Sequence, residues 1–269
     1  MNPTPRLDRL SALLEGLAPA ISVHHAGDAT TVTHVPASES DQLHLHLLTA
    51  GHIDLELDDG RRIPLAAPAI AVVRADWPHR LVPSGSTGSP GLFCASARFD
   101  GPAAGLLLQA FEQPLPLALD ESGSELDLIV RLIAQELTQP RCGQPALLAR
   151  AGEILFIGLL RHLVANPRTP AGLLNGLAEP RIARALVAMH GTPQAPWTLE
   201  SLALEAGMSR TAFAVRFREA MNHTPGAYLA HLRLSVARRA VRSGRGLKRA
   251  AAEAGYASTT ALSRALARH

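Results

Sequence analysis

Residues 198–209 read TLESLALEAGMS, and residues 246–258 read GLKRAAAEAGYAS. The two stretches superpose with Gly207 on Gly255, and after one inserted residue the match continues into the segments that follow. Each copy predicts a short helix, a glycine turn and a second helix that begins at a hydroxyl cap. The sequence therefore predicts a duplicated helix-turn-helix. The two predicted units span about residues 198–221 and 246–268.

The segment between the two units predicts one long helix. Pro225 stands near its start, Gly244 at its end, and residues 227–243 contain no helix breaker. At about 1.5 Å per residue such a helix spans roughly 25 Å, which is of the order of the roughly 34 Å turn of B-DNA. We therefore expect one chain to place the second helix of each unit in successive major grooves.

Charge divides the chain in the same way. Residues 177–269 hold 14 Arg and Lys against 5 Asp and Glu, whereas residues 1–176 hold 12 against 18. A basic C-terminal part behind a mildly acidic one indicates a polyanion as the partner of the C-terminal part alone. A helical bundle with a solvated basic face is the alternative, but a duplication with glycine and cap in register disfavours it.

The N-terminal part alternates between short apolar runs and turns. Eight runs between residues 21 and 99 predict strands, with turn residues about every ten positions. This spacing is typical of an antiparallel sandwich or barrel. The pattern then changes to helical periodicity at 126–137 and 145–165, and the second helix carries more apolar surface than one face needs. We expect it to pack on a partner helix, one from another subunit being an option.

The predicted fold class is α+β, with an N-terminal antiparallel β-barrel, two helices and an all-α domain. The predicted divisions are a barrel at 1–120, a helical dimerisation or linker region at 121–165, a flexible linker at 166–179 and a DNA-binding domain at 180–269. The first twenty residues predict neither a signal peptide nor a membrane span. Two cysteines are too few for a disulfide framework, so we expect a cytoplasmic protein with reduced thiols.

The motifs of the C-terminal part resemble those of the AraC/XylS family of transcription regulators. PWTLESLALEAGMSRTAFAVRFREAMNHTPGAYLAHLRLSVARRAV and AAAEAGYASTTALSRALARH carry the resemblance, over about residues 180–269. LHLHLLTAGHIDLEL, WPHRLV and FCASARFDGP, with the helices after them, resemble the cupin-type sensor domain of some of these regulators. The resemblance implies a sensory barrel, a helical dimerisation region and two helix-turn-helix units that bind double-stranded promoter DNA. The implied partners are a small-molecule effector, RNA polymerase for an activator, and a second copy through 126–165.

The resemblance also implies residues that meet DNA. Base-reading positions fall on Thr211, Ala214 and Val215 in the first unit and on Thr259, Thr260, Ser263 and Arg264 in the second. Ala214 and Val215 cannot form hydrogen bonds, so we expect the second unit to carry most of the direct readout. Arg264 can bond guanine with two hydrogen bonds, worth about 1–3 kcal/mol of discrimination, although a phosphate contact or a pair with Glu253 is the alternative. Caps and cations complete the predicted set: Ser209, Arg210, Arg216, Arg218, Ser258 and Arg268.

Three histidines of the predicted barrel are the main candidates in the sensor. His44 and His46 are two residues apart on a predicted strand, so they share a face, and His79 follows Pro78 where the resemblance implies that a strand re-enters the barrel. Three imidazoles can bind Zn, Fe or Cu, with Cys94 as a fourth ligand. However, the cupin metal motif has a glutamate after its histidine pair, where this chain has TAGH at 49–52. We therefore expect no cofactor, and a role in packing or in contact with a small ligand.

Two further residues belong to this predicted ligand site. Trp77 precedes Pro78 at a turn and is expected to line the barrel mouth or to pack. Cys94 lies on an alternating strand, which favours a buried inert thiol over a redox sensor. The function that follows is a regulator that responds to a small molecule or oxidant. A metal-dependent cupin enzyme fused to a DNA-binding domain is the alternative, and the missing glutamate argues against it.

The last stretch, GYASTTALSRALARH at 255–269, reads as the turn and recognition helix of the second unit. The resemblance implies a further short helix after this point. We therefore expect Leu262 and Leu266 to lack cover and the second unit to be less stable than the first.

Overall fold

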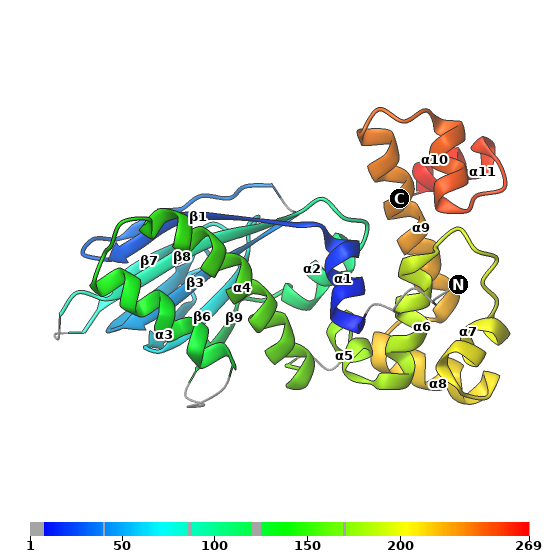
Figure 1. Cartoon of the computed structure of the whole chain (residues 1–269). Helices are drawn as coiled ribbons and strands as arrows, with labels where there is room; N and C mark the ends of the chain where they lie inside the picture. The colour runs from blue at the N-terminus through cyan, green and yellow to red at the C-terminus, as the bar shows by residue number, and fades with distance from the viewer. Residues whose placement is uncertain (1–7, 40, 86–87, 120–124, 169–170, 269) are drawn as a thin grey trace. The chain divides into compact units, whose positions relative to one another are not determined.

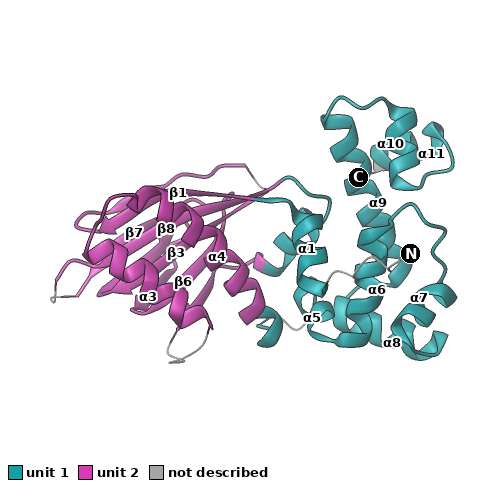
Figure 2. Ribbon diagram, in the orientation of Figure 1, with its two compact units in different colours: residues 1–19, 100–110, 163–269 teal, residues 20–99, 111–162 magenta. Residues whose placement is uncertain are grey.

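The computed structural model describes residues 8–39, 41–85, 88–119, 125–168 and 171–268 of the chain. The described residues form two compact units (Figure 1 and Figure 2). One unit comprises residues 20–99 and 111–162, and the other comprises 1–19, 100–110 and 163–269. No described helix is both long enough and apolar enough to cross a membrane.

Nine strands form two antiparallel sheets among the described residues. Five strands pair in the order β1-β8-β3-β6-β9 and four in the order β2-β7-β4-β5. Apolar side chains from both sheets make one cluster that includes Leu48, Leu55, Val73 and Leu81, so the sheets pack face to face. The predicted barrel thus takes the form of a sandwich. The strands are β1 (Pro19–Asp28), β2 (Thr33–Val35), β3 (Gln42–Ala50), β4 (His52–Leu57), β5 (Arg62–Ala66), β6 (Ala69–Arg74), β7 (His79–Ser84), β8 (Gly91–Phe99) and β9 (Leu115–Ala118).

The five-stranded sheet is covered on its second face by helices α3 (Glu125–Thr138) and α4 (Gln144–Ala165). This explains why β3 is buried along nearly its whole length rather than on alternate residues. Gly152 of α4 lies against Ile21 and Phe93, and Phe156 packs on Phe99 with ring centroids 5.6 Å apart. The surplus apolar surface predicted for residues 145–165 is therefore covered largely within the same unit.

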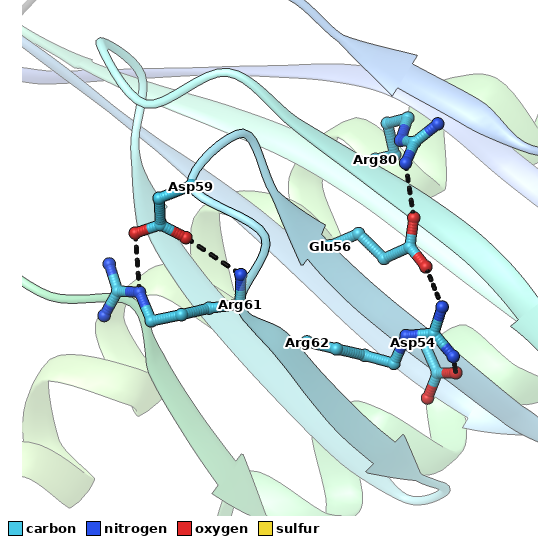
Figure 3. A network of polar contacts seen from close by, with 6 residues as sticks. All are labelled: Asp54, Glu56, Asp59, Arg61, Arg62 and Arg80. Carbon is cyan, nitrogen blue, oxygen red and sulfur yellow. Dashed lines mark hydrogen bonds and ion pairs between the residues drawn. The ribbon is translucent and has the colours of Figure 1, made fainter.

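The outer face of the four-stranded sheet is polar. Glu56 of β4 lies opposite Arg62 of β5 and Arg80 of β7, and its carboxylate pairs with both guanidinium groups (Figure 3). Its neighbours Leu55 and Leu57 point into the sandwich. The strict alternation of β4 follows from these two faces, and the cross-strand ion pairs contribute roughly 0.2–1 kcal/mol each.

The other of the two compact units is helical. The sequence predicted its C-terminal helices, and the structure adds the helix α1 (Arg9–Leu17), which packs on α6, and the segment around α2 (Ala104–Leu108). The predicted linker at 166–179 contains the helix α5 (Leu173–Ala178). The remaining helices are α6 (Pro180–Gly191), α7 (Leu199–Ala206), α8 (Arg210–Met221), α9 (Pro225–Arg242), α10 (Leu247–Ala254) and α11 (Thr259–Arg268).

Candidate functional site

The first helix-turn-helix comprises α7 and α8, and local chemistry sets its bounds. Thr198 and Ser201 form a capping box in which the Ser201 N–H donates to Thr198 Oγ1 at 3.1 Å and the Thr198 N–H donates to Ser201 Oγ at 2.9 Å. Gly207 ends α7 with φ +64°, a left-handed conformation that favours glycine. Ser209 then caps α8 by accepting from the Ala212 N–H at 3.3 Å. The turn predicted from the sequence is present.

An aromatic core holds these helices together. Phe213 and Phe217 project from one face of α8, with ring centroids 5.5 Å apart, and Phe217 packs on Tyr228 of α9 at 5.7 Å. All three side chains are fully buried. Met221 closes the same core at the end of α8. The opposite face of α8 is left exposed, which is the requirement for a helix that enters a groove.

A half-buried histidine, His190, contacts this core. His190 Nε2 is 2.7 Å from the Tyr228 hydroxyl, and His190 Nδ1 is buried without a hydrogen-bond partner. Burial disfavours the charged imidazole and lowers the pKa of His190 to about 4.

This lowered pKa predicts acid sensitivity of the helical unit. The unfolded chain binds a proton at His190 near pH 6.5, whereas the folded chain binds it only near pH 4, so stability is retained above pH 6.5 and lost as the pH falls towards 4. Thermal melts of the protein between pH 7 and 4 should show this decline. His190→Gln should reduce the decline for the helical unit while leaving the contribution of the buried histidines of the sandwich, and an unchanged pH profile in that variant would contradict the assignment.

The second helix-turn-helix comprises α10 and α11 on the same plan. Gly255 ends α10 with φ +76°, and Ser258 caps α11 by accepting from the Ala261 N–H at 3.1 Å. Its core consists of small side chains from α9 and α10, namely Ala237, Ala240, Ala250, Ala251 and Ala254, around Leu262. Leu262 is fully buried and Leu266 packs partly buried against it. Leu262 is therefore covered, contrary to expectation. The lower stability of the second helix-turn-helix stays a prediction.

The exposed faces of α8 and α11 carry the residues predicted to meet DNA. Ala214 is half-buried, and the other predicted residues whose side chains the structure describes are exposed. The side chain of Arg268 lies outside the described part. The exposed residues are Ser209, Arg210, Thr211, Val215, Arg216 and Arg218 in the first unit and Ser258, Thr259, Thr260, Ser263 and Arg264 in the second.

Ion pairs distinguish the arginines of this surface. Arg216 pairs with Glu179 at 3.2 Å and with Glu219 at 3.1 Å, so part of its charge is already compensated. Glu253, the alternative partner of Arg264, pairs instead with Arg245 and Arg249. Within the described residues Arg218 and Arg264 have no ion pair, and both guanidinium groups are available to a polyanion.

The three predicted sensor histidines meet inside the β-sandwich. His44 and His46 project from β3 of one sheet and His79 from β7 of the other, and all three side chains are buried. Each imidazole offers a nitrogen within 4.8 Å of the others. His46 Nε2 lies 2.8 Å from His79 Nε2, and His44 Nδ1 is buried without a partner. The cluster therefore joins the two sheets through polar groups in an apolar interior.

The hydrogen bonds fix the tautomers of this cluster. His79 Nδ1 is 2.8 Å from the Trp77 carbonyl oxygen, which can only accept, so His79 carries its proton on Nδ1. The 2.8 Å contact then requires a proton on His46 Nε2. His46 Nδ1 must accept, and the Cys94 thiol donates to it at 3.1 Å. Trp77 thus serves the site through its backbone carbonyl, while Arg61 stacks 5.2 Å from the centre of its ring.

Burial keeps the whole cluster uncharged. It lowers the pKa of His44 to about 4, that of His46 well below its usual range, and that of His79 less strongly because the Trp77 carbonyl favours the protonated ring. It also raises the pKa of the Cys94 thiol to about 12. Cys94 is therefore a thiol and not a thiolate, which disfavours the redox role considered from the sequence.

Neutral imidazoles are the form that binds transition metals, and the cluster fits such an ion once His46 carries its proton on Nδ1 instead of Nε2. Zinc bonds of about 2.0–2.1 Å in a tetrahedron place ligand nitrogens about 3.3 Å apart, a spacing that small side-chain shifts from the present one would reach. The Trp77 carbonyl already orients His79, as hydrogen-bond acceptors behind ligating histidines do in metal sites. Cys94, however, contacts the nitrogen of His46 that faces away from His79. It lies behind a ligand and does not supply the predicted fourth one.

Sequence reasoning missed two polar neighbours of the cluster. Ser96 lies opposite His44 in the β3–β8 register, and its hydroxyl is 2.7 Å from His24 Nε2 of β1. The alternation of β8 already contained the signal, since Ser96 is two residues after Cys94 and shares its face. The surroundings of the cluster therefore include a serine and a fourth histidine.

The architecture defines a class: a cupin-type domain joined to a duplicated helix-turn-helix. Residues 8–165 match the model of a family described as cupin, and residues 202–269 match that of a helix-turn-helix domain. The chain belongs to the AraC-type transcription regulators that carry an N-terminal cupin domain. The family suggested by the sequence motifs is thereby confirmed.

Individual proteins give the same picture. The HTH-type transcriptional regulator AlkR of Acinetobacter baylyi is 34% identical over 56% of this chain and 50% of its own length. The RCS-specific HTH-type transcriptional activator RclR of Escherichia coli is 30% identical over 75% of this chain and 71% of its own length. The chain thus spans about half the length of the first relative. The crystal structure of fatty-acid-bound ToxT from Vibrio cholerae covers 93% of this chain and 91% of that one, with 10% identity and a TM-score of 0.40, too low to support further conclusions.

Proposed function

We propose that this protein is a sequence-specific DNA-binding transcription regulator whose β-sandwich senses a small ligand. The observation that carries the proposal is the pair of capped, exposed helices α8 and α11, one in each helix-turn-helix, on a strongly basic part of the chain. A ligand that favours one arrangement of the sensor and the DNA-binding part would change promoter occupancy by shifting populations. Whether occupancy activates or represses depends on where the operator lies.

Selection of bound sequences from random DNA tests this proposal directly. A full-length chain that enriches a motif with two half-sites would support it. Enrichment of no motif at any salt concentration would contradict it. A variant without residues 177–269 should bind no selected sequence, and binding by that variant would place the DNA interface elsewhere.

Arg264 and Arg218 give a sharper prediction because one is expected to read a base and the other a phosphate. Arg264→Ala should lose discrimination at one base pair by about 1–3 kcal/mol. Arg218→Ala should weaken binding to all sequences alike and lower the salt slope by about one. Affinities for a panel of single-base operator variants at several salt concentrations distinguish the two. Uniform weakening by Arg264→Ala would mean a phosphate contact.

The effector that the sandwich would accept follows from its chemistry. His44, His46 and His79 present neutral nitrogens in a buried, mostly apolar interior, with one imidazole already oriented by a carbonyl. The sequence disfavoured a metal because the glutamate of the cupin motif is missing. The convergence of three imidazoles favours a borderline transition ion such as Zn²⁺ even in the absence of that glutamate. The ion would be held by three imidazoles, with a further position for water or a small ligand.

The remaining partners belong to the same proposal. Leu128 and Leu132 of α3 and Ile154 of α4 are exposed apolar side chains, which favours a homodimer through residues 126–165. RNA polymerase is the further partner if the protein activates transcription. Action on promoter DNA places the protein in the cytoplasm.

A metal-dependent enzyme fused to a DNA-binding domain is the second candidate, and the histidine cluster is the observation that favours it. The relatives of this chain are transcription regulators, which favours a protein without catalytic activity. Less than about 0.1 equivalent of any transition metal after reconstitution would eliminate the enzyme.

A further inference from the structure

The loop between α6 and α7 touches the second helix-turn-helix, although it lies just before the helices of the first. The loop spans residues 192–197, TPQAPW. The backbone of Gln194 packs directly on Gly255, the turn glycine between α10 and α11. A Cβ atom on Gly255 would lie 2.7 Å from Gln194 Cα and 3.1 Å from its carbonyl oxygen. Only glycine permits this approach, so Gly255 serves both the turn and the contact.

Arg233 of α9 holds the loop in this position. Its Nε donates to the Pro193 carbonyl and its terminal nitrogen donates to the Ala195 carbonyl, both at 2.8 Å. The two carbonyls flank Gln194, so one guanidinium group binds the loop on both sides of the residue that contacts Gly255. Such charge-assisted bonds from a planar fork are both stronger and more directional than neutral ones.

The loop itself is stiff. Pro193 and Pro196 fix two of its φ angles. The indole N–H of Trp197 donates to the Thr192 carbonyl at 2.8 Å, and the Ala195 N–H donates to the same oxygen at 3.1 Å. The loop therefore joins Gln194, which contacts Gly255, to Thr198, which caps α7, through a short and constrained stretch of chain.

Tyr256, the residue after Gly255, holds the second turn on the core of its own helix-turn-helix. Tyr256 packs against the alanine core of this unit together with Val236 of α9. Burial raises the pKa of Tyr256, and the positive charges of Arg233 and Arg238 oppose that rise. Arg233 thus lies where α9, the loop and the second turn converge.

We propose that Arg233 and the 192–197 loop act as a strut that fixes the angle between the two helix-turn-helix units, and so determine which spacing of DNA half-sites one chain accepts. This inference rests on the proposed DNA-binding function. The helix α9 is the covalent connection between the units (Figure 1), and the strut adds a second connection away from its axis. Arg233 is a positioning residue, since it orients both recognition helices without being assigned a DNA contact.

The test uses the full-length chain and the operator obtained by selection. Affinity is measured for the whole operator, for each half-site with the other scrambled, and for operators with base pairs inserted between the half-sites. Arg233→Ala should weaken binding to the whole operator on the order of tenfold. Without the strut the second helix-turn-helix is poorly oriented when the first is bound, so its contact with DNA adds less to the affinity. Binding to single half-sites should change by less than about twofold, and the penalty for altered spacing should become smaller.

Two variants serve as companions. Arg233→Lys keeps the charge but cannot form the planar fork, so it should reproduce the altered spacing profile even if the alanine variant folds poorly. Arg242→Ala removes an exposed arginine from the same helix without touching the loop, and should retain the spacing profile of the unaltered chain.

Three results would contradict the proposed role of the strut. A salt slope reduced by about 0.9 with an unchanged spacing profile would mean that Arg233 contacts a phosphate. Equal losses for half-sites and whole operator would mean that Arg233 merely stabilises one unit. An unaltered chain that selects no DNA at all would remove the proposed function and the role of the strut with it, and this result is recognisable before any variant is made.

Discussion

Replacing Phe217 with alanine is expected to destabilise the first helix-turn-helix strongly and to weaken specific DNA binding. Phe217 is fully buried between Phe213 and Tyr228, so the change removes two aromatic contacts and leaves a cavity. Such truncations cost about 3–5 kcal/mol, a large part of the roughly 5–15 kcal/mol that stabilises a typical domain. The melting temperature of the helical unit should fall by more than about 10 °C.

Leu204→Ala is the matched control for this loss. Leu204 is an apolar residue of the same helix-turn-helix, but 81% of its surface is exposed. Its truncation should change stability by no more than about 0.5 kcal/mol. Calorimetry and operator binding are measured for both variants. If Phe217→Ala melted like the unaltered chain, the aromatic core would not be what holds α7, α8 and α9 together.

The helix-turn-helix units were predictable because their determinants are local. Gly207 and Gly255 each end a helix in a left-handed conformation, and Ser209 and Ser258 each cap the next helix, within stretches a dozen residues long. The face shared by His44 and His46 was predictable for the same reason, since alternation along a strand needs no knowledge of its partners. Whether the rings converge with His79 depends on how the two sheets face each other, which strand periodicity does not encode.

Contacts between distant segments were not predictable. The left-handed turn already accounts for Gly255, so no separate pattern indicated that Gln194 approaches it. In the sequence, nothing distinguishes Arg233 from the other arginines of the predicted long helix. Cys94 was placed correctly beside the histidines, but alternation cannot tell which nitrogen of His46 it faces. The packing of α1 on α6 likewise joins segments far apart in the chain.

Replacing His46 with alanine should abolish high-affinity binding of Zn²⁺ or Co²⁺ to the sandwich. His46 is the central ring, bonded to His79 through Nε2 and to Cys94 through Nδ1, and its loss leaves two imidazoles that cannot hold the ion alone. We expect about one equivalent of metal in the reconstituted chain, and an affinity lower by more than about a hundredfold in His46→Ala. Equilibrium dialysis with elemental analysis measures both quantities.

Cys94→Ser and His52→Ala make this prediction specific to the geometry. Cys94 lies behind His46, so its replacement should keep the stoichiometry and change affinity by about tenfold or less, as expected of a residue that contacts a ligand and not the ion. The Co²⁺ form should accordingly lack the sulfur-to-metal charge-transfer absorption that a thiolate ligand would give. His52 is an exposed histidine outside the cluster, and its removal should have no effect. If His46→Ala bound metal like the unaltered chain while His52→Ala did not, the ion would belong to the surface, and the buried rings would instead serve packing or an organic ligand.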